Sequence, residues 1–198
     1  MSRYTAPLPD EFSPRQRALY AAIVDGPRKH QAGLVPVVDE AGRLLGPFAL
    51  MTIAPEIGDA VQSVGAALRF SGAFAPRTRE LAILTVAVHR GSDFEWFAHV
   101  NAGRDAGLTD AQLRAIQQRH EPGGLDATDA CVWRATEALL AQGRLDDEEY
   151  AETVRVVGAA GLAELVWLIG YYSTLQLALA TFDPALPADV AGVVTRPV

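Results

Sequence analysis

Signals that begin and end helices recur along almost the whole chain, whereas the alternating patterns typical of strands are nearly absent. Ser13 precedes a proline and has a glutamine three positions later, a combination that begins helices. Thr109 and Gln112 form a second capping box. Gly143 and Gly158 follow helical runs, where glycine is a typical C-terminal cap. The sequence therefore predicts an all-α fold.

The predicted helices are separated by glycine and proline. We expect them over about residues 14–25, 48–53, 55–70, 76–90, 93–105, 109–118, 127–142, 146–158 and 161–182. They suggest an N-terminal helix with a long irregular loop (1–47), one helical core domain (48–182) and a C-terminal tail (183–198). Within the loop, residues 34–43 resemble a short hairpin that Pro36 weakens. Long irregular loops such as 26–47 often form a lid or an entrance.

Composition narrows the class of protein. The 198 residues are 49% hydrophobic and 21% charged, enough to bury a core as one domain. The net charge of −7 argues against nucleic acid and anionic membranes as partners. Cys131 stands alone, which excludes an intramolecular disulfide framework and a two-thiol redox centre. Because the N-terminus also lacks the apolar run of a secretory signal, we expect a cytoplasmic protein.

The segment 165–182 carries no charge over 18 residues, close to the length that spans a bilayer. Gln176 and the pair Tyr171 and Tyr172 make it a poor lipid-facing helix. We expect a helix buried on all sides, either in a helical core or in a subunit interface, and no membrane association. A small protein with such a helix needs neighbours to cover it, which indicates a homo-oligomer.

Glu80 lies one turn inside a helix that is apolar around nearly its full circumference. Desolvation raises the pKa of a carboxyl group and suits it to proton transfer. The alternative is a glutamate that only balances the helix N-terminus and pairs with Arg77 or Arg79. His89 is half a turn out of phase with Glu80, so we expect it to be structural or exposed.

Glu95 and His99 are four residues apart on the next predicted helix and therefore share a face. A carboxylate beside an imidazole orients the ring and builds an acid–base pair. Trp96 is expected to form an apolar wall that binds substrate. The alternative is purely structural, because Ser92 followed by Glu95 is also a capping box.

A metal centre is a further alternative at this place. Glu80, Glu95 and His99 supply three ligand types suited to zinc or iron if their helices pack face to face. The Glu-x-x-His spacing of di-iron bundles is absent, because the offset here is four. We therefore expect neither a metal nor a cofactor.

Three stretches carry a pattern shared with a known family: Arg77-x-Arg79-Glu80-Leu81-Ala82-Ile83-Leu84, then Gly91-Ser92-x-Phe94-Glu95-Trp96-x-x-His99, then Gly103-Arg104-x-Ala106-Gly107-Leu108-Thr109-Asp110. Over residues 45–182 the sequence resembles the carboxymuconolactone decarboxylase family, which also contains the AhpD-like alkylhydroperoxidases. The resemblance implies an AhpD-like helical bundle that assembles into trimers or hexamers, with a pocket near helix ends and subunit contacts.

The same resemblance separates two chemistries. The peroxidase branch has two cysteines where this chain has Ser92 and Glu95, although its glutamate and histidine match Glu80 and His99. Thiol peroxidase activity is rejected, since that chemistry needs a thiolate. What remains resembles the decarboxylase branch. It implies His99 as the acid, Glu95 as its orienting partner, Glu80 as a second acid–base group, and Ser92 or nearby N–H groups as the oxyanion site.

These residues lead to three functional hypotheses. The first is a cofactor-free carbon–carbon lyase that acts on a small carboxylated lactone or a related acid in aromatic compound catabolism. The second is a lactone hydrolase or isomerase with the same acid–base groups. The third is a non-catalytic oligomer that binds a ligand or a partner, in which His99 is a core residue.

Overall fold

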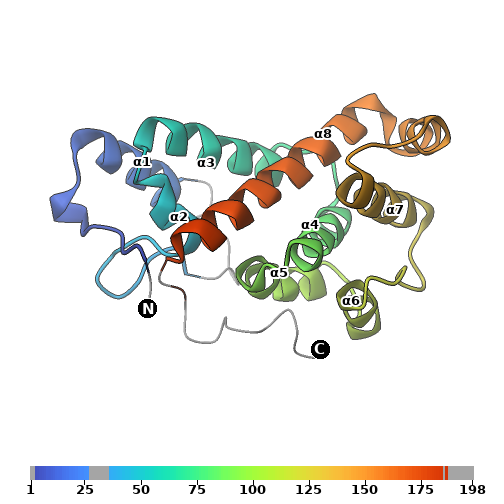
Figure 1. Ribbon diagram of the computed structural model, residues 1–198, viewed down its shortest axis with the longest axis horizontal. Helices are drawn as coiled ribbons and strands as arrows, with labels where there is room; N and C mark the ends of the chain where they lie inside the picture. The colour runs from blue at the N-terminus through green and yellow to red at the C-terminus, as the bar shows by residue number, and fades with distance from the viewer. Residues whose placement is uncertain (1–2, 27–35, 185, 187–198) are drawn as a thin grey trace. The chain divides into compact units, whose positions relative to one another are not determined.

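The computed structural model describes residues 3–26, 36–184 and 186. Its elements are η1 (Pro9–Glu11), α1 (Pro14–Val24), α2 (Gly46–Met51), α3 (Pro55–Phe70), α4 (Pro76–Arg90), α5 (Asp93–Asp105), α6 (Asp110–Gln117), α7 (Ala127–Gln142) and α8 (Asp147–Phe182) (Figure 1). Extended pairing in the described residues is limited to two isolated bridges, Tyr4 with Pro184 and Val38 with Leu44. The predicted all-α fold is confirmed.

Most predicted helix boundaries agree with the structure, because the predicted caps form. Ser13 Oγ accepts a hydrogen bond from the Gln16 amide, and the Gln16 side chain accepts one from the Ser13 amide. The two helices predicted at 146–158 and 161–182 are also found, since Gly158 has a non-helical backbone (φ 73°, ψ 166°) that interrupts α8 with a kink between them. The expected short hairpin forms around the antiparallel bridge of Val38 with Leu44, where the amides of Asp39 and Leu45 donate to the carbonyls of Arg43 and Val37; residues 34 and 35 lie outside the described ranges.

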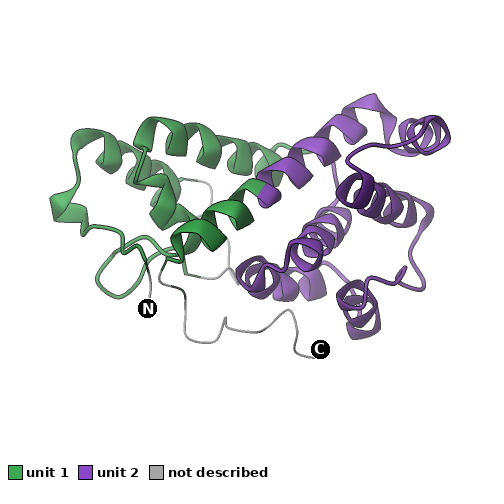
Figure 2. Ribbon diagram, in the orientation of Figure 1, with its two compact units in different colours: residues 1–72, 174–189 green, residues 73–173, 190–198 purple. Residues whose placement is uncertain are grey.

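The chain divides into two compact units (Figure 2). Unit 1 comprises Met1–Gly72 and Thr174–Asp189, and within it α3 packs against α1 and α2. Unit 2 comprises Ala73–Ser173 and Val190–Val198, and within it α4 packs against α5, α6 and α7. The boundaries expected near residues 47 and 182 stay predictions, and most of the tail after residue 183 lies outside the described residues.

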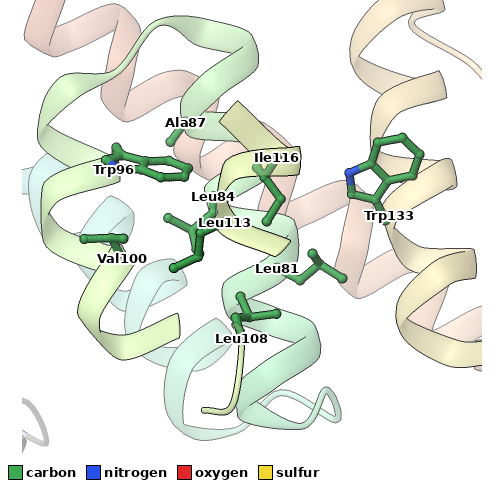
Figure 3. Close-up of a cluster of buried hydrophobic side chains, with 9 residues drawn as sticks. All are labelled: Leu81, Leu84, Ala87, Trp96, Val100, Leu108, Leu113, Ile116 and Trp133. Atoms are coloured by element: carbon green, nitrogen blue, oxygen red, sulfur yellow. The ribbon is translucent and has the colours of Figure 1, made fainter. Parts of the chain in front are cut away.

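The core of unit 2 is built around α4, whose apolar residues are buried on every side as predicted. Side chains from α4, α5, α6 and α7 meet in one cluster (Figure 3). The cluster consists of Leu81, Leu84, Ala87, Trp96, Val100, Leu108, Leu113, Ile116 and Trp133. Each large apolar side chain buried there contributes about 1.5–3 kcal/mol. This core holds α4 and α5 in fixed register, which positions the polar side chains described next.

The segment 165–182 of α8, which we expected to be buried on all sides, is buried only in part. Leu165 and Leu168 are fully buried, whereas Trp167 is 66% and Leu177 is 69% exposed. Burial on all sides within one chain is therefore wrong, and the alternative, a subunit interface, stays a prediction. Length and composition alone would let α8 cross a membrane, which is equally typical of a core helix in a soluble protein.

Candidate active site

The turn between α4 and α5 brings distant polar residues together. Gly91 adopts a left-handed conformation (φ 64°) that ends α4, and Ser92 caps α5 immediately afterwards. The two helices then pack closely, because Gly103 has no side chain: a Cβ there would lie 3.0 Å from Leu84 Cδ1. A side chain at position 103 would force Leu84 to shift, and the left-handed backbone at position 91 favours glycine. The sequence thereby places the middle of α5 beside the start of α4.

The imidazole of His99 lies between two buried carboxylates. Its Nδ1 is 2.7 Å from Glu80 Oε2, and its Nε2 is 3.6 Å from Glu95 Oε2. Glu80 is 2%, Glu95 3% and His99 7% exposed. We call these three residues the trio. The sequence predicted that they converge, and they do, but the closer partner of the imidazole is Glu80 rather than Glu95.

An ionised carboxylate only accepts hydrogen bonds, so the short contact places a proton between Glu80 and Nδ1. In the neutral imidazole the lone pair then resides on Nε2, which faces Glu95. The separation of 3.6 Å from Glu95 Oε2 is longer than a hydrogen bond. The site thus contains one tightly held ring nitrogen and one nitrogen that can exchange a proton.

Ser92 and Trp96, the predicted substrate-binding residues, are placed differently from that expectation. Ser92 is 1% exposed, and its Oγ accepts the Glu95 amide at 3.4 Å, which is a helix cap. The Ser92 amide donates to Ala87 O, not to Glu95, so the capping box is incomplete and the Glu95 carboxylate faces His99. Trp96 is 1% exposed and belongs to the core cluster (Figure 3). Its ring presents almost no surface on which a ligand could rest.

Two further residues border the trio, and sequence reasoning gave neither a role in catalysis or binding. Tyr172 on α8 makes an edge-to-face contact with His99, with ring centroids 5.2 Å apart. Arg79 lies 3.8 Å from Glu80 Oε1 and is only 12% exposed. No spacing rule reaches Tyr172, which is far along the chain. Arg79 was visible in the sequence, but only as an alternative partner that would neutralise Glu80.

His89 lies outside the trio, as its position on α4 predicted. It is half-buried, and burial, followed by the charge of Arg119, lowers its pKa below 6.5. Within the described ranges, no group of three or more His, Cys, Asp or Glu side chains has a geometry that could hold a metal ion. The trio lines neither the pocket beside Cys131 nor the apolar pocket beside Met51.

Residues 55–138 match the model of the carboxymuconolactone decarboxylase family. This segment contains the trio and all of α3 to α6. The match covers less than half of the chain, so the similarity to that family is a finding about this segment. A solved structure from Agrobacterium tumefaciens, a protein of unknown function described as a candidate antioxidant defence protein AhpD, matches with a TM-score of 0.62 and 17% identity, over 70% of this chain and 96% of that one. No curated protein matches the chain.

The carboxymuconolactone decarboxylase assignment and the AhpD-like fold agree with the resemblance seen in the sequence. The matched segment lacks paired cysteines, since the single thiol of the chain, Cys131, is buried on α7. In the resemblance drawn from the sequence, Ser92 and Glu95 stand at the two cysteine positions of the peroxidase branch. Glutamate at position 95 supplies a second carboxylate to His99.

Proposed function

We propose that this protein is a carboxymuconolactone decarboxylase-like, cofactor-free carbon–carbon lyase acting on a small carboxylated lactone or a related acid. One observation carries the proposal: a buried imidazole held between two carboxylates, 2.7 Å from Glu80 and 3.6 Å from Glu95. Acid–base catalysis needs an oriented group that gains and loses a proton near neutral pH, which histidine does.

We assign the roles of the two carboxylates differently from the sequence prediction, because Glu80 is the closer partner of the ring. Glu80 holds Nδ1 and fixes the orientation and tautomer of the ring. Nε2 then carries the transferable proton, and Glu95 exchanges it with Nε2 when the side chains close their 3.6 Å separation. Glu80 is thus the orienting residue, and Glu95 is the second acid–base group.

In the proposed reaction the bond between the substrate carbon and its carboxylate breaks, and CO2 leaves. The electron pair of that bond spreads into the unsaturated lactone as a dienolate, and in this proposal the free N–H groups at the N-terminus of α5 stabilise it. The imidazolium of His99 then gives its Nε2 proton to carbon. Glu95 returns a proton to Nε2 and is itself reprotonated from solvent.

The burial of the trio is also compatible with the non-catalytic alternative. The trio is no more than 7% exposed, which suits a core network as well as a reaction centre. A lactone hydrolase or isomerase would use the same proton transfers.

We also propose a cytoplasmic homo-oligomer, a trimer or hexamer, because α8 exposes large apolar side chains such as Trp167. An assembly could contribute surfaces to the site.

The test is CO2 release from carboxymuconolactone by the wild-type protein and by His99→Asn. We expect His99→Asn to lose about 10²–10⁴-fold in kcat, the usual contribution of a general acid, with its circular dichroism and assembly mass unchanged. His120→Asn, which alters an exposed histidine outside the trio, is the matched control. Wild-type turnover in His99→Asn contradicts the proposal. Tight ligand binding without turnover in the wild type supports the binding alternative.

A further inference from the structure

Arg79 on α4 is a largely buried guanidinium that makes no hydrogen bond within the part of the chain that the structure describes. Its side chain is 12% exposed, and its Nε is buried without an acceptor. Its one ion pair among those residues is with Glu80 Oε1 at 3.8 Å, beyond hydrogen-bond range. Buried donors left unsatisfied cost free energy, so buried arginines normally have acceptors. Arg79 therefore has unused capacity for an acceptor.

The position of Arg79 determines where an acceptor bound by its guanidinium would lie. The Glu80 carboxylate is shared, with Oε1 toward Arg79 and Oε2 bonded to His99 Nδ1. A group bound by the guanidinium would consequently lie beside the trio, not at a remote surface. This makes the unused donors part of the same site as the acid–base groups.

We propose that Arg79 binds the carboxylate of a small anionic ligand and holds it beside the trio. A planar guanidinium presents parallel N–H donors that match both oxygens of a carboxylate, which a lysine cannot do. The reaction of that ligand rests on the proposed function, whereas its binding does not. The inference assigns recognition of the substrate carboxylate to Arg79, so the protein should discriminate a carboxylated lactone from a neutral one.

The ligand charge also affects the proton on His99. The imidazole is faced by Glu80 and Arg79 from α4, by Glu95 from its own helix and by Tyr172 from α8. A carboxylate bound at Arg79 adds a negative charge near the imidazole, and a nearby negative charge favours its protonated form. Binding of the anion and protonation of His99 are thereby coupled. The bound substrate favours the imidazolium that later donates a proton to it.

Calorimetric titration of the full-length protein with two probes tests the binding. The probes are 5-oxotetrahydrofuran-2-carboxylate and γ-butyrolactone, which share the ring and differ in the carboxylate. We expect the wild type to prefer the carboxylate and Arg79→Gln to bind it about tenfold or more weakly, since charge-assisted hydrogen bonds are lost. Arg79→Lys should be intermediate, because it keeps the charge and loses the paired donors. Arg114→Gln, on the exposed face of α6, is the control and should bind like the wild type.

Equal affinity of the wild type and Arg79→Gln for the carboxylate overturns the inference, as does a wild type that binds neither probe. If Arg79→Gln does not fold, the affinity of Arg79→Lys for the carboxylate is the test instead. A wild-type affinity in Arg79→Lys then also overturns the inference. A change in assembly mass in Arg79→Gln without weaker anion binding would assign Arg79 to a subunit contact instead.

Titration in two buffers of different ionisation enthalpy tests the coupling. The wild type should take up protons as the carboxylate binds, and His99→Asn should bind it with little uptake. The two proposals fail separately. Binding independent of Arg79, with turnover lost in His99→Asn, removes only the anion site. Binding dependent on Arg79, with full turnover in His99→Asn, removes only the acid–base role.

Discussion

Two arginines on α4 lie two residues apart, and each is paired with a buried carboxylate, yet their surroundings differ completely. Arg77 donates from Nε to Asp129 at 2.7 Å, from Nη2 to Gln112 at 3.1 Å and from Nη1 to the carbonyl of Gly107. Asp129, 1% exposed, also accepts the Thr78 hydroxyl at 2.7 Å. Among the residues that the structure describes, Arg79 pairs only with Glu80, at 3.8 Å.

The difference separates a polar network that stabilises the fold from one that leaves donors for a ligand. The Arg77 network joins α4, α6 and α7, and both oxygens of its carboxylate accept hydrogen bonds. Such a network holds elements in place and leaves nothing to bind. The region around Arg79 and His99 is buried to a similar degree. Its guanidinium and the Nε2 of its imidazole, however, can still form hydrogen bonds with a ligand. Donors left without acceptors beside a buried imidazole, more than burial itself, distinguish the candidate site from the Arg77 network.

The largest expected effect on stability comes from Asp129→Ala. It leaves the Arg77 charge without its partner, and breaking a buried pair costs about 3 kcal/mol or more. Urea unfolding measures the loss. Glu152→Ala, which breaks the exposed pair with Arg155, is the control and should leave the unfolding midpoint unchanged within error. If His99→Asn destabilises the protein as much as Asp129→Ala, the division between the two networks is wrong.

A smaller effect is expected for Ser92→Ala. The Ser92 hydroxyl caps α5 through a long 3.4 Å contact with the Glu95 amide, so its loss should cost about 0.5–1 kcal/mol. Thr109→Ala, which removes the cap of α6 away from the trio, is the matched control and should cost a similar amount. Equal stability loss with unchanged turnover would make Ser92 structural. A drop in kcat confined to Ser92→Ala would restore its predicted role at the oxyanion.

Much of the fold was predictable because local chemistry determines it. The caps at Ser13 and Thr109 set helix starts within the chain itself, without tertiary contacts. The break in α8 was predictable too, because Gly158 follows a helical run and its backbone is non-helical where the sequence placed a C-terminal cap. The exposure of Trp167 was not predictable, because it depends on what neighbouring segments cover.

The candidate site was predictable only in part. Glu95 and His99 share a helix face by periodicity alone. The contact between Glu80 and His99 depends on the turn at Gly91 and on the close approach at Gly103, which are tertiary features. Tyr172 comes from α8, and no spacing links it to His99. The unused donors of Arg79 required every neighbour to be placed, because satisfaction is a property of the folded chain.

The smallest predicted effect concerns His89, whose Nδ1 is buried without a hydrogen bond in the described chain. Burial, then Arg119, lowers its pKa below 6.5, while Arg90 lowers it further and Glu137 and a hydrogen bond to Leu140 oppose the shift. The unfolded chain therefore protonates first as pH falls through 6.5, and stability present above that pH is lost below it.

His89→Gln should accordingly lose less stability than the wild type between pH 7.5 and pH 5.5, measured as the free energy of unfolding in urea. The comparison isolates His89, because the carboxylates and the other histidines titrate in both proteins. An identical loss in the two would mean that this imidazole is protonated as easily in the folded as in the unfolded chain. In that case, a buried nitrogen without a hydrogen bond would not by itself distinguish the surroundings of His89 from the satisfied Arg77 network.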